Sequence, residues 1–302
     1  MLLLERGLIL SVEIAGQQAH FMGAETSQET GRHMETARHI QGGYPVVIVL
    51  AGILLVYLVS PVIYFFFFYS WPQTGAALSD PVAQGALITS VLSATMATGI
   101  TALLGIPLGY VLARRRLPGR QALTLLIYLP LVFPPVVSGI LLLVLYGPYG
   151  LVGEPFTSAG LELDSTFTGI VLAQIFVASP FVIIAARSAF EAVDPALEEV
   201  AATLGKSAWQ IFWCINLPAA RLGILAGLLL GWLRALGEFG ATAVMAYHPY
   251  TLPVYVYVQL SGLGVQPALG LLLFVLPVSI VGGGLALWFE ERSAHRSHHV
   301  AR

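Results

Sequence analysis

The sequence has little charge and only one cysteine. Charged side chains make up 10% of the 302 residues, whereas soluble domains carry about 25%. A surface this poor in charge argues against a large soluble domain. The formal net charge is −2, so no basic surface for nucleic acid is expected. Cys214 is the single cysteine, which excludes an intramolecular disulfide and a multi-cysteine metal site.

Long apolar runs take the place of the missing charge. Hydrophobic residues make up 57% of the chain, and a bilayer core of roughly 30 Å needs about 20 of them in each helix. Six runs qualify, so the sequence predicts an all-α integral membrane protein with a six-helix transmembrane bundle over residues 44–289. The expected spans are residues 44–69, 83–113, 123–146, 167–190, 222–247 and 267–289.

Lysine and arginine are absent from three of the segments between the runs. Residues 70–82, 147–166 and 248–266 hold none, whereas the other connecting segments and both termini contain lysine or arginine. Basic segments tend to stay on the cytoplasmic side of a membrane. The N-terminus, the C-terminus and residues 191–218 are therefore expected in the cytoplasm.

The two polar ends lie outside the predicted bundle. Residues 1–43 are polar and show no secretory pattern, so we expect a disordered cytoplasmic extension. Met22 and Met34 lie within it and are alternative starts to Met1. Residues 290–302 form the expected cytoplasmic tail.

Three histidines in this tail have helical spacing, namely His295, His298 and His299. Nothing acidic or thiolate follows them to complete a coordination set. We therefore expect a solvated tail and no metal bound by this chain.

The segment between the fourth and fifth runs predicts a short amphipathic helix. Asp194 followed by Pro195 is typical of a helix N-terminus, and Gly205 is typical of a helix end. Such a helix outside the membrane needs a partner groove to cover its apolar face. The alternative, a helix lying on lipid head groups, usually has a basic polar face, whereas Glu198 and Glu199 make this one acidic. The apolar residues at helical spacing are Leu197, Val200, Ala201 and Leu204.

The same segment resembles the signature loop of type I, binding-protein-dependent ABC importer permeases. The matching positions are Glu199, Ala201, Gly205, Ile215, Leu217 and Pro218. Val200 stands where that signature usually has alanine. The resemblance implies that the helix inserts into a cleft on a separate ATPase subunit. The residues that it assigns to ATPase coupling are Leu197, Glu198, Glu199, Val200, Ala201, Leu204, Gly205, Ile215, Leu217 and Pro218.

Residues 204–207, Leu-Gly-Lys-Ser, look like the end of a phosphate-binding loop. A P-loop begins with a glycine five residues before Gly205, and Val200 stands there instead. No strand is expected ahead of it, so the backbone cradle for phosphate cannot form. The chain is therefore not expected to be an enzyme or to bind a cofactor, and ATP and Mg²⁺ belong to the partner ATPase.

Three stretches extend the resemblance over about residues 83–289. They are residues 109–120, 129–139 and 233–242, which are most similar to molybdate and tungstate permeases, with sulfate permeases next. The resemblance implies an ATP-driven importer that carries molybdate or tungstate by alternating access, with sulfate or thiosulfate as the alternative cargo. It also implies two copies of an ABC ATPase, an extracytoplasmic oxyanion-binding protein, a homodimer of this chain and a prokaryotic plasma membrane.

One of these stretches places two charges deep within the fifth predicted span. Arg234 and Glu238 lie four residues apart on one helix face, and charges at this depth should pair or face a wet cavity. Gly237 and Gly240 would let another helix approach closely. In one interpretation the stretch lines the translocation path or an inter-subunit seam. In the other, Arg234 and Glu238 form an intramembrane ion pair that only stabilises the packing of the bundle. The candidate residues are Arg234, Gly237, Glu238, Gly240 and Thr242.

A secondary transporter or channel that needs no ATPase is the alternative from another class. It predicts internal repeats and ionisable mid-span residues on several helices. The sequence shows no clear repeat, and only Arg234 and Glu238 lie deep within a predicted span. The importer is therefore the favoured interpretation.

Overall fold

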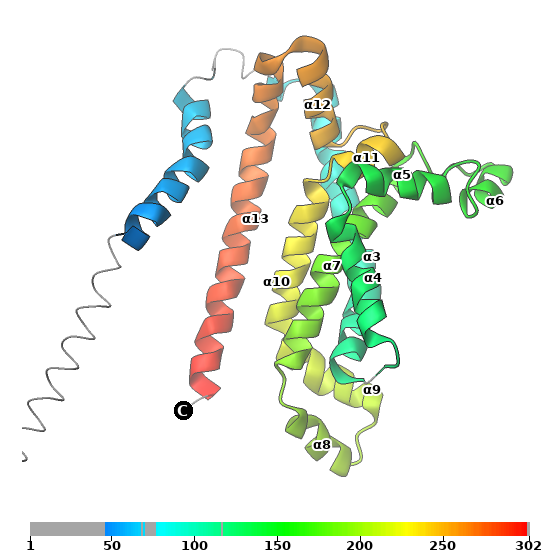
Figure 1. The fold of residues 1–302 in the computed structure, drawn as a ribbon, viewed down its shortest axis with the longest axis vertical. Coiled ribbons are helices and arrows are strands. Elements are labelled where there is room, and N and C mark those ends of the chain that lie inside the picture. The colour runs from blue at the N-terminus through cyan, green and yellow to red at the C-terminus, as the bar shows by residue number, and fades with distance from the viewer. Residues whose placement is uncertain (1–45, 68, 70–76, 116, 301–302) are drawn as a thin grey trace, which may run out of the picture. The chain divides into compact units, whose positions relative to one another are not determined.

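The computed structural model describes residues 46–67, 69, 77–115 and 117–300, and of residues 286, 287 and 289–300 the backbone only. All regular secondary structure in the described residues is helical (Figure 1), which confirms the predicted all-α class. The extension predicted over residues 1–43 lies outside them. The chain divides into two compact units, residues 1–69 and residues 70–302.

Five of the described helices are long and apolar enough to cross a membrane. One of them, Val46–Phe67, belongs to the first unit. The others are α3 (Pro81–Arg114), α7 (Phe167–Glu191), the run Ala208–Leu236 that ends in α10 (Leu217–Leu236), and Val265–Leu285 within α13 (Val265–Val300). The bent pair α4 (Arg120–Val132) and α5 (Pro135–Tyr146) supplies a sixth span if it is counted as one. This number agrees with the six predicted spans.

The run Ala208–Leu236 begins with α9 (Ala208–Ile211). Shorter helices lie between the long elements, namely α6 (Gly153–Ser158), α8 (Pro195–Thr203), α11 (Gly240–Met245) and α12 (Leu252–Leu263). Within the second unit, α8 and α9 lie at one end, and α6, α11 and α12 lie toward the other (Figure 1).

Helix α7 packs against both α3 and α10 in the second unit. The three helices meet at small residues, because Ala94, Ala178 and Ala235 are fully buried in one cluster. A Cβ atom at Gly227 of α10 would overlap that of Ala185 on α7. Lipid tails are as apolar as a leucine side chain, so close van der Waals contact is a main force that holds membrane helices together.

The third predicted span consists of two helices. Helix α4 ends at Val132, α5 begins at Pro135, and the two are bent by 113°. A proline disfavours helical backbone in the residue before it, and here two prolines follow one another. Phe133 and Pro134 both have extended ψ angles, of 133° and 136°. The expectation of one helix over residues 123–146 is therefore wrong.

The fifth predicted span differs at both ends. Its helical run begins at Ala208, because Ser207 and Gln210 form a capping box. It continues through a π-helix, Phe212–Asn216, into α10 and ends at Leu236. The expectation of one helix over residues 222–247 is wrong, since α11 is separate and begins at Gly240.

The last helix runs further than predicted. Helix α13 continues to Val300, although the span was expected to end at residue 289. The side chains of His295, His298 and His299 lie outside those described, so the solvated tail stays a prediction.

The packing of α10 on α7 predicts a strong effect of adding a side chain at the interface. We expect Gly227→Val to destabilise the protein by about 1–3 kcal/mol, the usual cost of overpacking. Thermal unfolding of the detergent-solubilised protein measures it. The control is Gly85→Val on α3, where an added Cβ atom meets nothing within 4 Å. Equal losses in both variants would contradict close packing as the cause.

Candidate functional site

Helix α8 is the short helix that the sequence predicts after Asp194. The Asp194 carboxylate accepts a hydrogen bond from the Ala196 N–H at 2.9 Å, and Pro195 occupies the first helical position. Gly205 follows the last turn with a φ of +80°. Its N–H donates to Ala202 O at 3.0 Å, and the Lys206 N–H donates to Ala201 O at 3.1 Å. This pair of bonds is a Schellman motif, and it confirms Gly205 as the helix stop.

The apolar face of α8 is largely uncovered in the structure. Leu197, Val200 and Leu204 are 51%, 60% and 77% exposed, whereas Ala201 is buried. Among the described residues, α8 packs on α9 and the π-helix, at the end of the second unit (Figure 1). An amphipathic helix with an open apolar face at the end of a bundle is suited to contact another protein.

The rest of the signature lies in helix and not in loop. Ile215 belongs to the π-helix, while Leu217 and Pro218 begin α10. Asn216 between them is fully buried, and its Nδ2 donates to the Tyr110 hydroxyl of α3 at 3.2 Å. A single-turn π-helix is often found at a functional site.

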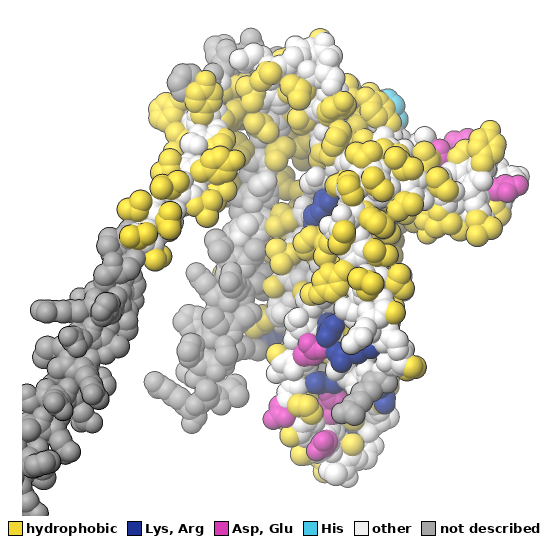
Figure 2. Space-filling model, in the orientation of Figure 1, with side chains coloured by type: hydrophobic (Ala, Val, Ile, Leu, Met, Phe, Trp, Pro, Cys, Tyr) yellow, Lys and Arg dark blue, Asp and Glu magenta, His cyan; other side chains and the backbone are white. Residues whose placement is uncertain are grey.

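Charged side chains gather at the end that carries α8 and α9 (Figure 2). Arg114 at the end of α3 pairs with Glu198 of α8 at 2.5 Å and donates to Val193 O at 2.7 Å. Glu191 at the end of α7 accepts from Arg120 at 3.0 Å and from Arg187 at 2.9 Å. The sequence indicated only that lysine and arginine lie on this side. It did not predict these ion pairs, because most of the partners are distant in sequence and Glu191 is not part of the signature.

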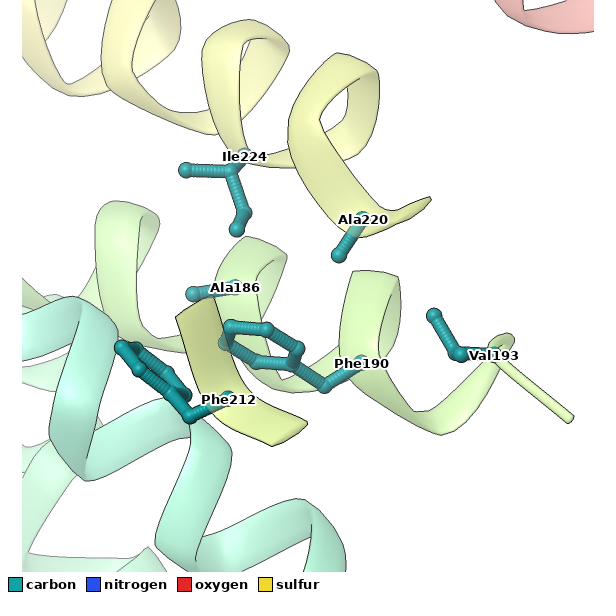
Figure 3. Close-up of a cluster of buried hydrophobic side chains, with 6 residues drawn as sticks. All are labelled: Ala186, Phe190, Val193, Phe212, Ala220 and Ile224. Carbon is teal, nitrogen blue, oxygen red and sulfur yellow. The ribbon is translucent and has the colours of Figure 1, made fainter. Parts of the chain in front are cut away.

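A hydrophobic cluster brings together residues that precede and follow α8 in the sequence (Figure 3). The rings of Phe190 and Phe212 lie beside each other with centroids 6.0 Å apart. Tyr110 packs edge-on against both. The cluster therefore connects the end of α7, the π-helix and the start of α10. Its buried members are Ala186, Phe190, Val193, Phe212, Ala220 and Ile224.

Glu238 lies in the break between α10 and α11 and is 1% exposed. One of its carboxylate oxygens pairs with Arg234 at 2.5 Å, and the other accepts from the Ala241 N–H at 2.8 Å. Thr242 donates its hydroxyl to Phe239 O at 2.9 Å and to Glu238 O at 3.1 Å. The carboxylate thus satisfies a backbone N–H at the buried N-terminus of α11 and neutralises the guanidinium at the same time.

The two helix breaks contact each other, because α11 packs on α5. A Cβ atom at Gly240 would lie 2.8 Å from Pro135 Cβ, so a larger residue would not fit there. At Gly237, the nearest atom to an added Cβ is Leu233 O at 3.5 Å. Close approach is therefore confirmed at Gly240, while no described helix approaches closely at Gly237.

The structure also bears on nucleotide and metal sites. Residues 204–207 follow helix α8, whereas a P-loop requires a strand at that place. Within the described part of the chain, no group of three or more His, Cys, Asp or Glu residues is arranged to hold a metal ion.

Comparison with known proteins identifies the class. The family model described as "Binding-protein-dependent transport system inner membrane component" matches residues 105–295. This is more than half of the chain, and the chain therefore belongs to that family. Together with the long apolar helices, the match shows a multi-pass membrane protein.

Three curated relatives are permease proteins of transport systems. A probable molybdenum ABC transporter permease protein of Haloferax volcanii is 41% identical over 80% of this chain and 85% of its own. A molybdate/tungstate transport system permease protein of Thermococcus kodakarensis is 40% identical over 67% of this chain and 77% of its own. A sulfate transport system permease protein of Synechocystis is 34% identical over 72% of this chain and 81% of its own. Because such relatives are permease proteins, this chain is a transport component and not an enzyme.

A solved structure has a similar fold. A chain in the crystal structure of a bacterial alginate ABC transporter, in complex with an alginate pentasaccharide-bound periplasmic protein, matches with a TM-score of 0.64. The match covers 85% of this chain and 96% of that one at 17% identity. At this identity the likeness concerns the fold, and it confirms the predicted fold of ABC importer permeases.

The buried carboxylate predicts a large effect of its removal. Glu238→Ala leaves Arg234 without its partner and α11 without its cap; because Arg234 is 30% exposed, we expect a cost of about 1–3 kcal/mol, that of an unsatisfied buried polar group. Glu238→Gln should cost less, because the amide oxygen still accepts from Ala241 N–H. Thermal unfolding in lipid nanodiscs measures both, with Glu154→Ala on exposed α6 as the neutral control. A Glu238→Ala variant as stable as the control would contradict the capping role.

Proposed function

We propose that this chain is the transmembrane subunit of an ATP-driven importer for molybdate or tungstate. The observation that supports it most strongly is the 41% identity to a probable molybdenum ABC transporter permease protein over 80% of this chain. In this proposal, two copies of the chain form the pathway in a prokaryotic plasma membrane. Two ABC ATPase subunits bind ATP and Mg²⁺, and an extracytoplasmic binding protein delivers the oxyanion.

Helix α8 is the proposed contact with the ATPase. Three of its apolar side chains, Leu197, Val200 and Leu204, are exposed and need cover. Its charged residues are acidic, which disfavours a position on anionic lipid head groups. A groove on a protein partner satisfies both conditions. We include Glu199 and Gly205 in this contact because they stand at matching positions of the signature loop.

The distribution of charge supports a cytoplasmic position for α8 and both chain termini. The end with α8 and α9 carries Arg114, Arg120 and Arg187, each in an ion pair. The segment around α6, residues 147–166, has acidic residues but no lysine or arginine. By the positive-inside rule, the α8 end faces the cytoplasm and the α6 end faces outward. The binding protein then docks on the α6 side.

The contact between the two helix breaks is the proposed translocation region. Arg234 there is 30% exposed although its partner Glu238 is almost fully buried. A partly exposed cation whose charge is balanced by a carboxylate can meet an anion without binding it too tightly to release. Alternating access would move α5 and α11 together, because Gly240 and Pro135 leave no space between them. The Arg234–Thr242 stretch contributes to the path or to the inter-subunit seam.

Sulfate or thiosulfate is the alternative cargo, because a sulfate permease protein is 34% identical over 72% of this chain. All of these anions are tetrahedral and doubly charged, so a site for one can accept another. The higher identity of the molybdenum and tungstate relatives favours the larger oxyanions. A secondary transporter is disfavoured, since these relatives are permease proteins of ABC systems.

The docking proposal predicts a face-specific effect on α8. We expect Val200→Asp to prevent co-purification of the ATPase, because a charge would have to enter an apolar groove without a partner. Ala202→Asp adds the same charge two residues away, on the opposite helix face, and should leave the complex intact. Pull-down from membranes with a tagged permease measures it. Equal recovery of the ATPase with both variants would disprove docking through the apolar face.

The substrate proposal predicts ATP-dependent uptake of molybdate and tungstate into proteoliposomes that contain the complete transporter. Calorimetry of the partner binding protein with molybdate, tungstate and sulfate gives the specificity independently. Uptake and binding that favour sulfate would identify sulfate as the cargo and would leave the proposal of an ATP-driven importer unchanged. Uptake without an ATPase would refute the importer.

A further inference from the structure

Arg114 links α3 to the chain just before α8 and to the first turn of α8. Its side chain is only 12% exposed, and Glu198 is 22% exposed. Nη2 of Arg114 donates to Val193 O at 2.7 Å, just before α8, while Nε pairs with Glu198 in the first turn of α8 at 2.5 Å. One guanidinium therefore connects α3 to both the entry and the body of α8.

Tyr110 links α3 to the far side of the same segment. It lies one helical turn before Arg114, and its hydroxyl accepts from the fully buried Asn216 at 3.2 Å. Its ring also packs on Phe190 of α7 and Phe212 of the π-helix, with centroids 5.2 Å and 4.9 Å away. The cytoplasmic end of α3 thus contacts the chain before, within and after α8.

These contacts are more specific than stability alone requires. A buried ion pair is often no more stabilising than apolar side chains of the same volume, and the cluster around Phe190 and Phe212 already fills this region. What the polar contacts add is direction, because Nη2 of Arg114 donates to Val193 O and the buried Asn216 amide donates to the Tyr110 hydroxyl, each at a defined angle. They fix α8 relative to α3, a helix to which it is not adjacent in sequence.

We propose that Arg114 and the Tyr110–Asn216 pair position α8 on α3, so that α3 receives the movement of α8 directly. This inference rests on the proposed function of α8 as the ATPase contact. Without these contacts, α8 would be linked to the bundle only through α7 and the π-helix. The ATPase would still dock, but its movement would be passed less completely to the spans.

The experiment uses the complete transporter in proteoliposomes, with molybdate and its binding protein as the probe. We expect Arg114→Ala to lower molybdate uptake per ATP hydrolysed by about tenfold, equivalent to about 1.4 kcal/mol of lost coupling. The ATPase should still co-purify, because the apolar face of α8 is unchanged. Arg115→Ala is the matched control, since it removes the same charge from the next, exposed residue.

Conservative variants separate positioning from folding. Arg114→Lys keeps the charge but cannot reach both acceptors in the same geometry, so an intermediate ratio of uptake to hydrolysis is expected. Tyr110→Phe keeps the ring and removes only the hydroxyl partner of Asn216, and it should lower the same ratio. The double exchange Arg114→Glu with Glu198→Arg should recover part of it. A purely structural role would reduce the amount of assembled transporter and leave the ratio unchanged.

The possible results are distinguishable. An unchanged ratio in both Arg114→Ala and Tyr110→Phe overturns the positioning role, and so does loss of the ATPase from Arg114→Ala while Arg115→Ala retains it. If Arg114→Ala does not fold, Tyr110→Phe alone decides. If the wild-type chain neither recovers an ATPase nor supports uptake of any oxyanion, the proposed function fails instead.

Discussion

Close packing at small residues is the constraint on which the rest of the second unit depends. Ala94, Ala178 and Ala235 allow α3, α7 and α10 to approach so closely that little space remains between their backbones. In a bilayer the hydrophobic effect does not drive helices together, so van der Waals contact between them must supply the attraction. It also fixes the relative heights of the three helices. As a result, their ends meet at α8 in a defined arrangement.

The two breaks in the bundle are possible because each is compensated locally. At the break in the third span, prolines remove the donors that an interrupted helix would leave unsatisfied. At the break after α10, the Glu238 carboxylate accepts from the start of α11 and balances Arg234. Irregular backbone at membrane depth is tolerated only where protein or water satisfies it. The contact of Gly240 with Pro135 places both compensated breaks together.

The opposite end of the bundle combines rigidity with an open surface. Behind α8, the rings of Phe190 and Phe212 and the buried Asn216 leave little freedom of movement. In front of it, Leu204 and its neighbours are exposed. A rigid support beneath an exposed apolar face suits the contact that we propose between α8 and an ATPase. The ion pair between Arg114 and Glu198 holds α8 to the end of α3, although the apolar face of α8 is exposed.

The sequence by itself determined the features that depend on neighbouring residues. The length of the apolar runs determined the number of spans, and Asp194, Pro195 and Gly205 determined α8, because caps and stops act within a few residues. The tertiary structure alone decided where α10 ends: an unbroken helix with an Arg234–Glu238 pair fits the sequence equally well. It likewise decided the partner of Arg114. Both depend on which distant helix approaches, and a pattern within one segment holds no information about that contact.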